Sequence, residues 1–136
     1  MKTGEFDVSL TFLDYNLVSQ TAAKGVLEPA SAYQVGVLNG AAVILGLLGG
    51  RDPREFKARP ETTRAFQLWQ WAQARGVNLL ALNLQYCLRD ARIASTLVGA
   101  ANPEQVEADV AAAFEPIPEK TWRALRDEMR LPLPPG

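Results

Sequence analysis

Hydrophobic and polar residues alternate along this chain in a way that separates short apolar segments from longer segments with helical periodicity. Three segments predict β-strands, because they are short, rich in β-branched or aromatic residues, and bounded by polar or glycine-containing turns. They are Phe6–Phe12, Val35–Asn39 and Ile93–Val98, with the strands themselves expected near residues 8–12, 35–39 and 94–98.

Helical patterns fill most of the chain between and after these strands. The predicted helices are Ser19–Tyr33, Glu61–Arg75, Leu79–Leu88, one that begins at Pro103, and one from Pro118 to about Met129. Gly76 suits the end of one helix and Asn78 the start of the next. Asn102 is expected to cap the helix that begins at Pro103, and Gln105 stands where it completes a capping box.

The order of these elements predicts an α/β fold in which parallel strands are joined by helical crossovers on the outer side. Residues 49–60 are expected to form a loop whose charged side chains are solvated. We expect one domain over residues 1–130 and a flexible tail over residues 131–136. Only three strands are visible, so we expect both edges of the sheet to stay open.

Composition and charge narrow the class of protein. The chain has 136 residues, is 48% hydrophobic and 21% charged, and has a net charge of −1, which is typical of a folded globular domain. The charge is not basic, so we expect no nucleic-acid partner. The single cysteine, Cys87, fits a reducing compartment. We see no signal-peptide pattern and no apolar run long enough to span a bilayer, and we therefore expect a soluble, cytoplasmic protein with no membrane partner.

Two glycine-containing turns follow predicted strands and suggest a binding site. Residues 38–42 read LNGAA, and residues 96–110 read TLVGAANPEQVEADV. A strand that ends at a glycine before a capped helix gathers backbone N–H groups at the positive end of the helix dipole, which favours phosphate. In a (β/α)8 barrel, the loops after the seventh and eighth strands form such a site. Small residues also serve tight packing at such turns, and both interpretations remain open at this point.

Three longer segments carry a family resemblance. They are FDVSLTFLDYNLVSQTA (residues 6–22), VGVLNGAAVILGLLGG (residues 35–50) and STLVGAANPEQVEADV (residues 95–110). They resemble the sixth, seventh and eighth strands of the aldo/keto reductase family with the turns that follow, and are most similar to its sugar-dehydrogenase branch. The resemblance runs from about Glu5 to Leu125. It implies a partial (β/α)8 barrel, and chemistry in which hydride passes between a nicotinamide cofactor and a carbonyl or alcohol.

The resemblance also implies cofactor contacts for ten residues. Those implied are Asn39 and Gly40 near the nicotinamide, Val43, Leu45 and Gly46 along the pyrophosphate, Gly99, Ala100 and Ala101 beside the adenosine phosphate, and Gln105 and Asp109 at the adenosine. Many relatives carry Lys or Arg on the last turn to pair a 2′-phosphate, and this turn has no cation. We therefore expect NAD rather than NADP, bound weakly or not at all by the isolated chain. Asp109 stands where the family usually has Asn.

The family's catalytic set is Asp, Tyr, Lys and His. The chain has no His, and none of Tyr15, Tyr33 and Tyr86 falls at the catalytic position. We therefore expect no catalytic residue and no metal site in this chain, and no activity when it is isolated. One hypothesis is the NAD(P)-binding part of an oxidoreductase. The other is a non-enzymatic, oligomeric half-barrel that serves in binding or as a scaffold, with vestigial cofactor loops. A natural half-barrel, a truncated relative and a piece of an enzyme all remain open.

The missing strands predict an exposed apolar surface. We expect Val8, Leu10, Phe12, Val37 and Leu97 on the sheet face that no helix covers. Burying one such side chain is worth roughly 1.5–3 kcal/mol. We therefore expect a homodimer or a higher homo-oligomer that associates through the would-be barrel interior.

Overall fold

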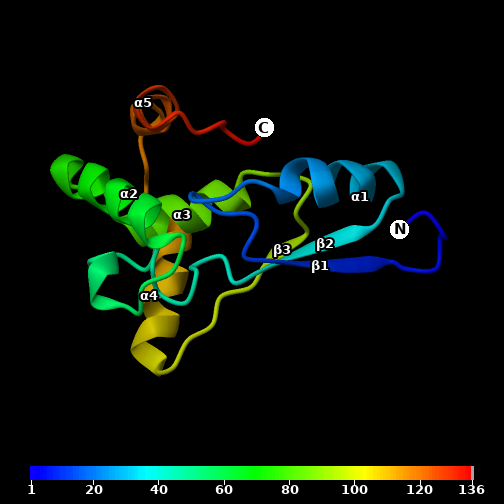
Figure 1. Ribbon diagram of the computed structural model, residues 1–136, viewed down its shortest axis with the longest axis horizontal. Helices are drawn as coiled ribbons and strands as arrows, with labels where there is room; N and C mark the ends of the chain where they lie inside the picture. Colours follow the sequence, from blue (N-terminus) through cyan, green and yellow to red (C-terminus); the bar gives the residue numbers. More distant parts are fainter. Residues whose placement is uncertain (136) are drawn as a thin grey trace.

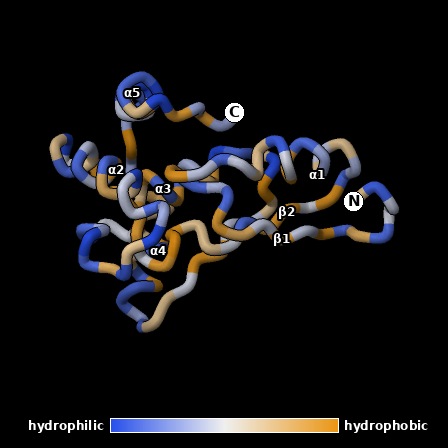
Figure 2. Tube along the Cα trace, in the orientation of Figure 1, coloured by the Kyte–Doolittle hydropathy of each residue, from blue (hydrophilic) through white to orange (hydrophobic). Residues whose placement is uncertain are grey.

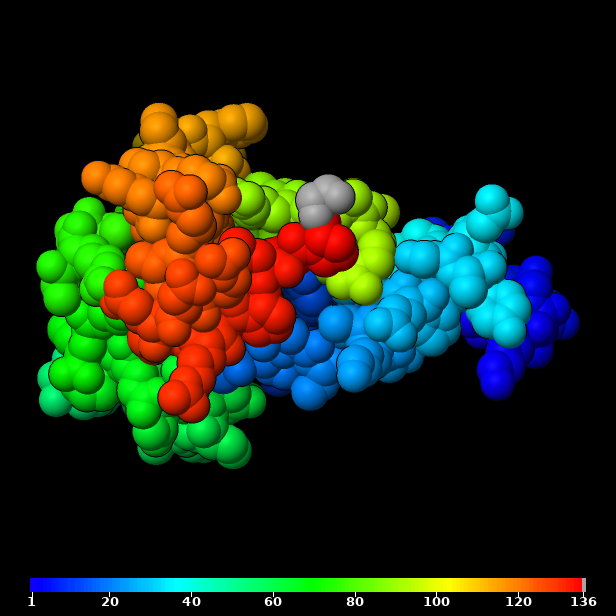
Figure 3. Space-filling view, turned by 90° about the horizontal axis from the view of Figure 1, so that it is seen from above, coloured from blue at the N-terminus to red at the C-terminus, as the bar shows by residue number. Residues whose placement is uncertain are grey.

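The computed structural model describes residues 1–135 and shows an α/β fold (Figure 1). Its elements are β1 (Val8–Phe12), a π-helical turn η1 (Ala23–Leu27), α1 (Glu28–Ala32), β2 (Gly36–Gly40), a 3-10 turn η2 (Pro53–Glu55), α2 (Thr62–Arg75), α3 (Leu79–Leu88), β3 (Ser95–Thr96), α4 (Pro103–Phe114) and α5 (Glu119–Met129). Figures 1 and 3 agree that β1 and α1 extend away from the body formed by α2 and α5.

The three strands form one parallel sheet in the order β1-β2-β3, which confirms the predicted fold class of a partial barrel. In the register, Leu10 pairs with Leu38, and Leu38 pairs with Ser95. The third strand is only two residues long, whereas the sequence predicted Ile93–Val98. Two further backbone hydrogen bonds flank it, from Ala94 to the Val37 carbonyl and from Leu97 to the Asn39 carbonyl. The ladder between β2 and β3 has two residue pairs, whereas the ladder between β1 and β2 has five.

The two faces of the sheet differ in burial. Strand side chains alternate between faces, and paired residues of neighbouring parallel strands share a face. Val37 and Asn39 are fully buried on the face beneath the helices, whereas Leu10 and Phe12 on the other face are about 60% exposed (59% and 62%). The prediction that Val37 lies on the exposed face is therefore wrong. Its neighbour Leu38, half-buried, takes that position because Val37 packs into the helix-covered core.

Helix α3 lies at the centre of the core and is buried almost all round, with Leu79, Leu82 and Tyr86 among its buried side chains. Figure 2 shows this helix as hydrophobic and α5 as mainly hydrophilic. Asn83, fully buried on α3, donates from Nδ2 to the Ala42 carbonyl (2.9 Å) and accepts from the Leu17 amide at Oδ1 (3.1 Å). It thereby ties the turns that follow β1 and β2 to one helix.

The helix ends follow the predicted capping signals. Gly76 ends α2 with a left-handed φ of 63°. The Asn78 side chain accepts from the amides of Leu80 and Ala81 at the start of α3. The predicted helix Ser19–Tyr33 is shorter than expected and changes character along its length, because the π-helical turn η1 passes directly into α1 with Leu27 and Glu28 both in the right-handed helical region. Pro29 lies inside this helical run and can donate no backbone hydrogen bond there.

The end of the chain has no regular secondary structure but begins packed on the core. Leu131 is 3% exposed, and the Tyr86 hydroxyl donates to the Pro132 carbonyl (2.6 Å). Gly136, the last residue of the expected tail, lies outside the described residues. None of the helices in residues 1–135 combines the length and hydrophobicity needed to cross a membrane.

Candidate functional site

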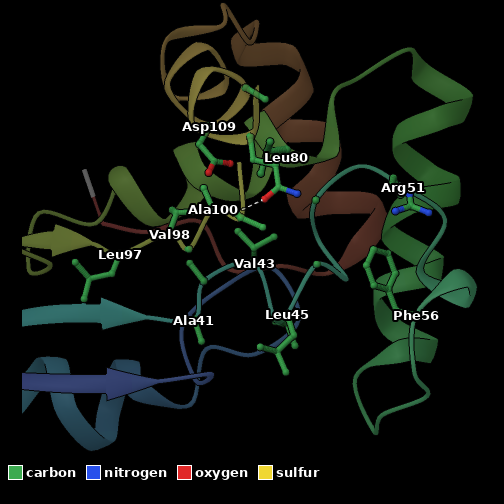
Figure 4. A pocket seen from close by; sticks show the side chains of 18 residues that line it. Ala41, Val43, Leu45, Arg51, Phe56, Leu80, Leu97, Val98, Ala100 and Asp109 are labelled. Atoms are coloured by element: carbon green, nitrogen blue, oxygen red, sulfur yellow. Dashed lines mark hydrogen bonds between the residues drawn. The ribbon is translucent and has the colours of Figure 1, made fainter. Parts of the chain in front are cut away.

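A cavity of about 700 Å³ lies beyond the C-terminal ends of β2 and β3. Its walls come from the segment after β2 and from the turn after β3 with the start of α4 (Figure 4). Ligands of α/β folds bind at the C-terminal ends of parallel strands. The lining residues are Ala41, Ala42, Val43, Ile44, Leu45, Gly46, Gly49, Arg51, Phe56, Leu80, Leu97, Val98, Gly99, Ala100, Ala101, Gln105, Ala108 and Asp109.

The wall that follows β2 has an unusual backbone. Ala41, Ile44 and Leu45 adopt left-handed φ values of 54°, 50° and 52°. Each non-glycine residue in this region costs about 1–2 kcal/mol, and such strained residues cluster at ligand-binding loops. The hydrogen bond from Asn83 to the Ala42 carbonyl holds this segment in place. Three of the six non-glycine residues with a positive φ in residues 1–135 therefore lie in this wall.

Gly46 allows an aromatic side chain to close against this wall. Its φ is 100°, and a Cβ built there would lie 2.6 Å from Cε1 of Phe56. Phe56 comes from the loop that follows, and the Arg51 guanidinium lies 5.4 Å from the centre of its ring. Arg51 also pairs with Glu55. Gly46 is therefore required both by its backbone angle and by close packing.

The wall that follows β3 is organised by the start of α4. Asn102 Oδ1 accepts from the Gln105 amide (2.9 Å), as the sequence predicted. Gln105 Oε1 accepts from the amide of Ala101 (2.6 Å), one residue before the capping residue. The Ala101 N–H is thus used internally. Within residues 1–135, the amides of Gly99 and Ala100 donate no hydrogen bond, and neither do those of Asn102 and Glu104 at the start of α4. All four residues are exposed, and their amides are candidate donors to a phosphate.

Gly99 differs from the other glycines at the strand ends. A Cβ at Gly99 would meet no atom within 4 Å, and its φ lies outside the left-handed region. At Gly40, by contrast, a Cβ would lie 3.0 Å from the Thr11 carbonyl oxygen. Tight packing therefore accounts for Gly40 and Gly46 but not for Gly99. Gly99 stands in open, exposed space, as Gly25 does.

The structure brings together all the predicted site residues except Asn39 and Gly40. Those that line the cavity are Val43, Leu45, Gly46, Gly99, Ala100, Ala101, Gln105 and Asp109. Asn39 is buried on the helix-covered face, where Nδ2 donates to the Tyr15 carbonyl (3.0 Å). Gly40 is buried at the end of β2. Neither residue lines the cavity.

Arg51 and Phe56 are lining residues that sequence reasoning missed. They belong to the loop that we expected to be solvated, and they reach the cavity only through the tertiary fold. Phe56 is the one aromatic residue in the charged segment RDPREFKARP (residues 51–60), and this was the available signal. Figure 4 places Arg51 and Phe56 at one end of the cavity, and Ala100 and Asp109 at the other.

The charges of the site are few and well separated. Arg51 and Asp109 are the charged residues among those lining the cavity. Partial burial raises the pKa of Asp109 above its ordinary value. In residues 1–135 no group of three or more His, Cys, Asp or Glu side chains is placed to hold a metal ion.

The tyrosines lie away from the cavity. Burial is the main cause that raises the pKa of Tyr15, and a hydrogen bond to Asp90 is the second. The Tyr15 hydroxyl donates this bond to Asp90 Oδ2 (2.5 Å). Burial also raises the pKa of Tyr86. Tyr33 is 48% exposed, and none of the three lines the cavity. The cavity therefore offers backbone donors, one cation and one carboxylate.

Comparison with known proteins agrees with this architecture. The model of the aldo/keto reductase family matches residues 1–128. The chain is 32% identical over 114 residues to the L-galactose dehydrogenase of Arabidopsis thaliana, covering 82% of this chain and 35% of that protein. It is 26% identical over 134 residues to the pyridoxal 4-dehydrogenase of Microbacterium luteolum, covering 94% and 39%. It is 24% identical over 141 residues to the D-threo-aldose 1-dehydrogenase of a Pseudomonas species, covering 98% and 43%.

The chain thus spans between 35% and 43% of the length of these relatives, all of which are dehydrogenases by name. The family match covers nearly the whole chain, and the three parallel strands have the arrangement expected of part of the family's barrel. This chain belongs to the aldo/keto reductase family.

Proposed function

We propose that this chain forms the NAD(P)-binding part of an oxidoreductase, and that its cavity holds the pyrophosphate and adenosine of the cofactor. Members of the family typically use NAD(P), and the matched relatives are sugar and pyridoxal dehydrogenases. The observation that carries the proposal is the turn after β3. It offers two amides without internal partners, at Gly99 and Ala100, beside the positive end of a capped helix.

Each part of the cavity suits a different part of the cofactor. The segment of Val43, Leu45 and Gly46 would follow the pyrophosphate, with Arg51 as the nearby cation. The turn of Gly99, Ala100 and Ala101 would lie beside the adenosine phosphate. Gln105 and Asp109, four residues apart on α4, lie on one face of that helix and would meet the adenosine. When bound, the cofactor would supply hydride chemistry, and these residues would bind and orient it.

The charges favour NAD over NADP. Of the two charged lining residues, the cation Arg51 lies at the end of the cavity away from α4. The end near α4 carries the carboxylate of Asp109. A 2′-phosphate there would meet a negative charge and no paired cation, which lowers its affinity relative to the hydroxyl of NAD.

We propose further that the isolated chain binds without turning over substrate. Its sequence has no histidine, and its tyrosines lie outside the cavity. A positioned acid of suitable pKa is needed to protonate a carbonyl oxygen, and the cavity wall presents none besides Asp109. The competing hypothesis is a non-enzymatic, oligomeric half-barrel with vestigial loops, and the exposed sheet face favours it. Cofactor titration separates the two.

The decisive experiment is a fluorescence titration of the chain with NADH, NADPH and their oxidised forms. We expect weak, saturable binding that favours NADH. Gly99→Val should weaken it by at least about tenfold, since a side chain there enters space left for the ligand. We expect no NADH formation from aldoses in the same preparation.

Gly25→Val is the matched control, because a Cβ at Gly25 also meets nothing within 4 Å and its φ is unremarkable, but it does not line the cavity. Its binding should equal that of the unmodified chain. Equal binding by Gly99→Val and Gly25→Val would refute the site assignment. Absence of saturable binding in all three proteins would support the non-enzymatic hypothesis.

A further inference from the structure

The sheet face opposite the helices is apolar and exposed, and we call it the open face. Its exposed side chains are Phe6, Val8, Leu10, Phe12 and Leu97, which are between 45% and 62% exposed, with Leu38 half-buried among them. Leu97 lies two residues after Ser95, which pairs with Leu38, so it points to the same side. Parallel sheets are normally covered on both faces, and an exposed apolar patch of this size marks an interaction surface.

We propose that the open face binds a second copy of this chain. The paired residues of β1 and β2 on this face are Val8 with Gly36, Leu10 with Leu38, and Phe12 with Gly40. None of them is charged. Two copies facing each other across a twofold axis therefore bring no like charges together, and the net charge of −1 per chain adds little long-range repulsion.

The size of the open face is sufficient for a specific dimer. At the exposed fractions of its side chains, the face offers on the order of 600 Å² of apolar surface per copy. Two copies would therefore bury about 1,200 Å², the lower end of the range for stable protein interfaces. A second copy would also cover the aromatic rings of Phe6 and Phe12, the residue type that most strengthens interfaces.

A competing apolar surface lies on α4 but suits a second copy less well. Val106, Val110 and Phe114 form an exposed stripe beside a groove of about 350 Å³ that also includes Leu88. Every charged residue of α4 is acidic, namely Glu104, Glu107 and Asp109. Apposition of two such helices would bring like charges together. The uncharged open face is therefore the better surface for self-association.

The first test measures molar mass by light scattering at micromolar concentration. We expect twice the chain mass of 14.9 kDa. Leu10→Glu, on the open face, should give a monomer with an unchanged circular dichroism spectrum, because Leu10 is already 59% exposed in one chain. Val110→Glu is the matched control, since Val110 is 56% exposed on α4, and this variant should remain dimeric.

A cysteine cross-link tests the same face without disrupting it. The native Cys87 is fully buried, so an introduced cysteine reports alone. Val8→Cys should form a disulfide-linked dimer under mild oxidation, whereas Val110→Cys should not. A monomeric unmodified chain would overturn the proposal, as would a dimer dissociated by Val110→Glu and not by Leu10→Glu. If the chain is monomeric, adding the unmatched part of the Pseudomonas dehydrogenase tests whether a different partner covers the open face. Binding of that part by the monomer would assign the open face to that partner and overturn the proposal.

Discussion

The two walls of the cavity follow the same sequence pattern and are built in opposite ways. The wall after β2 holds Ala41, Ile44 and Leu45 in left-handed conformations and packs Phe56 against Gly46. The wall after β3 has no residue with a left-handed φ between 97 and 109, and Gly99 stands in open space. One wall is strained and anchored by Asn83 from the core, and the other is relaxed and exposed.

This difference assigns different roles to similar glycines. At Gly46, the absence of a side chain serves the protein, because it makes room for Phe56. At Gly99, a side chain would meet no atom of the described chain within 4 Å, and under the proposed function this space is the part that a ligand would use. A substitution in the first wall should change stability, whereas one in the second should change binding. Three predictions test this division, beginning with the largest expected effect.

Gly46→Ala should strongly destabilise the fold. The new Cβ would lie 2.6 Å from the Phe56 ring, at a φ of 100° that alanine adopts poorly. We expect the free energy of unfolding to fall by about 2–4 kcal/mol, from left-handed strain together with displacement of the ring. Urea denaturation followed by circular dichroism measures this change.

Two matched variants separate the causes. Gly50→Ala has nearly the same φ, 98°, but its Cβ meets nothing closer than 3.9 Å, so it reports backbone strain alone. Gly99→Ala should alter stability by less than about 0.5 kcal/mol, because neither cause applies. If Gly46→Ala cost no more than Gly50→Ala, the packing of Phe56 would not depend on Gly46. A large fall in the free energy of unfolding for Gly99→Ala would contradict the difference between the two walls.

Asn102→Ala should have an intermediate effect on the relaxed wall. It removes the side-chain acceptor of the Gln105 amide, and loss of such a cap costs about 1 kcal/mol. The same urea experiment measures the loss. Asn102→Asp is the control, because a carboxylate can accept the same hydrogen bond and also suits the helix dipole. Equal destabilisation by both variants would mean that the side chain does not act as the cap.

Much of the fold was predictable because its signals are local. The stops and starts at Gly76, Asn78 and Asn102 lie within a turn of the residues that they cap, so α2, α3 and the start of α4 were predicted nearly to the residue. The sequence did not predict which face of the sheet each side chain of β2 occupies. Val37 and Leu38 are both apolar, so hydropathy could not decide which one packs beneath the helices.

The candidate site was predictable to the extent that it follows strand ends. Turns directly after β2 and β3 come together wherever the two strands are parallel neighbours, which explains why most of the predicted residues line one cavity. Arg51 and Phe56 arrive from a loop whose path depends on packing against Gly46. No periodicity or cap marks that contact, and only the tertiary structure reveals it.

Asp109→Asn should have the smallest effect, and it tests charge in the relaxed wall. Its carboxylate lies at the end of the cavity near α4, opposite Arg51, and it opposes the negative charge of the cofactor. Neutralising it should raise NADH affinity about two- to fivefold, or roughly 0.4–1 kcal/mol, at moderate ionic strength. Glu107→Gln, on the same helix but not lining the cavity, should leave the affinity unchanged.

The pH dependence of the gain in NADH affinity tests whether the charge of Asp109 causes it. Partial burial raises the pKa of Asp109 above its ordinary value, so as the pH falls this carboxyl becomes protonated at a higher pH than an exposed one does. The advantage of Asp109→Asn should therefore be greatest near pH 7 and shrink toward none in acid, where both side chains are neutral. Folding stability follows the same sign, because a raised pKa means that ionisation opposes the folded state. The variant should thus be at least as stable as the unmodified chain at neutral pH. A gain in affinity that persists unchanged in acid would show that shape rather than charge is responsible.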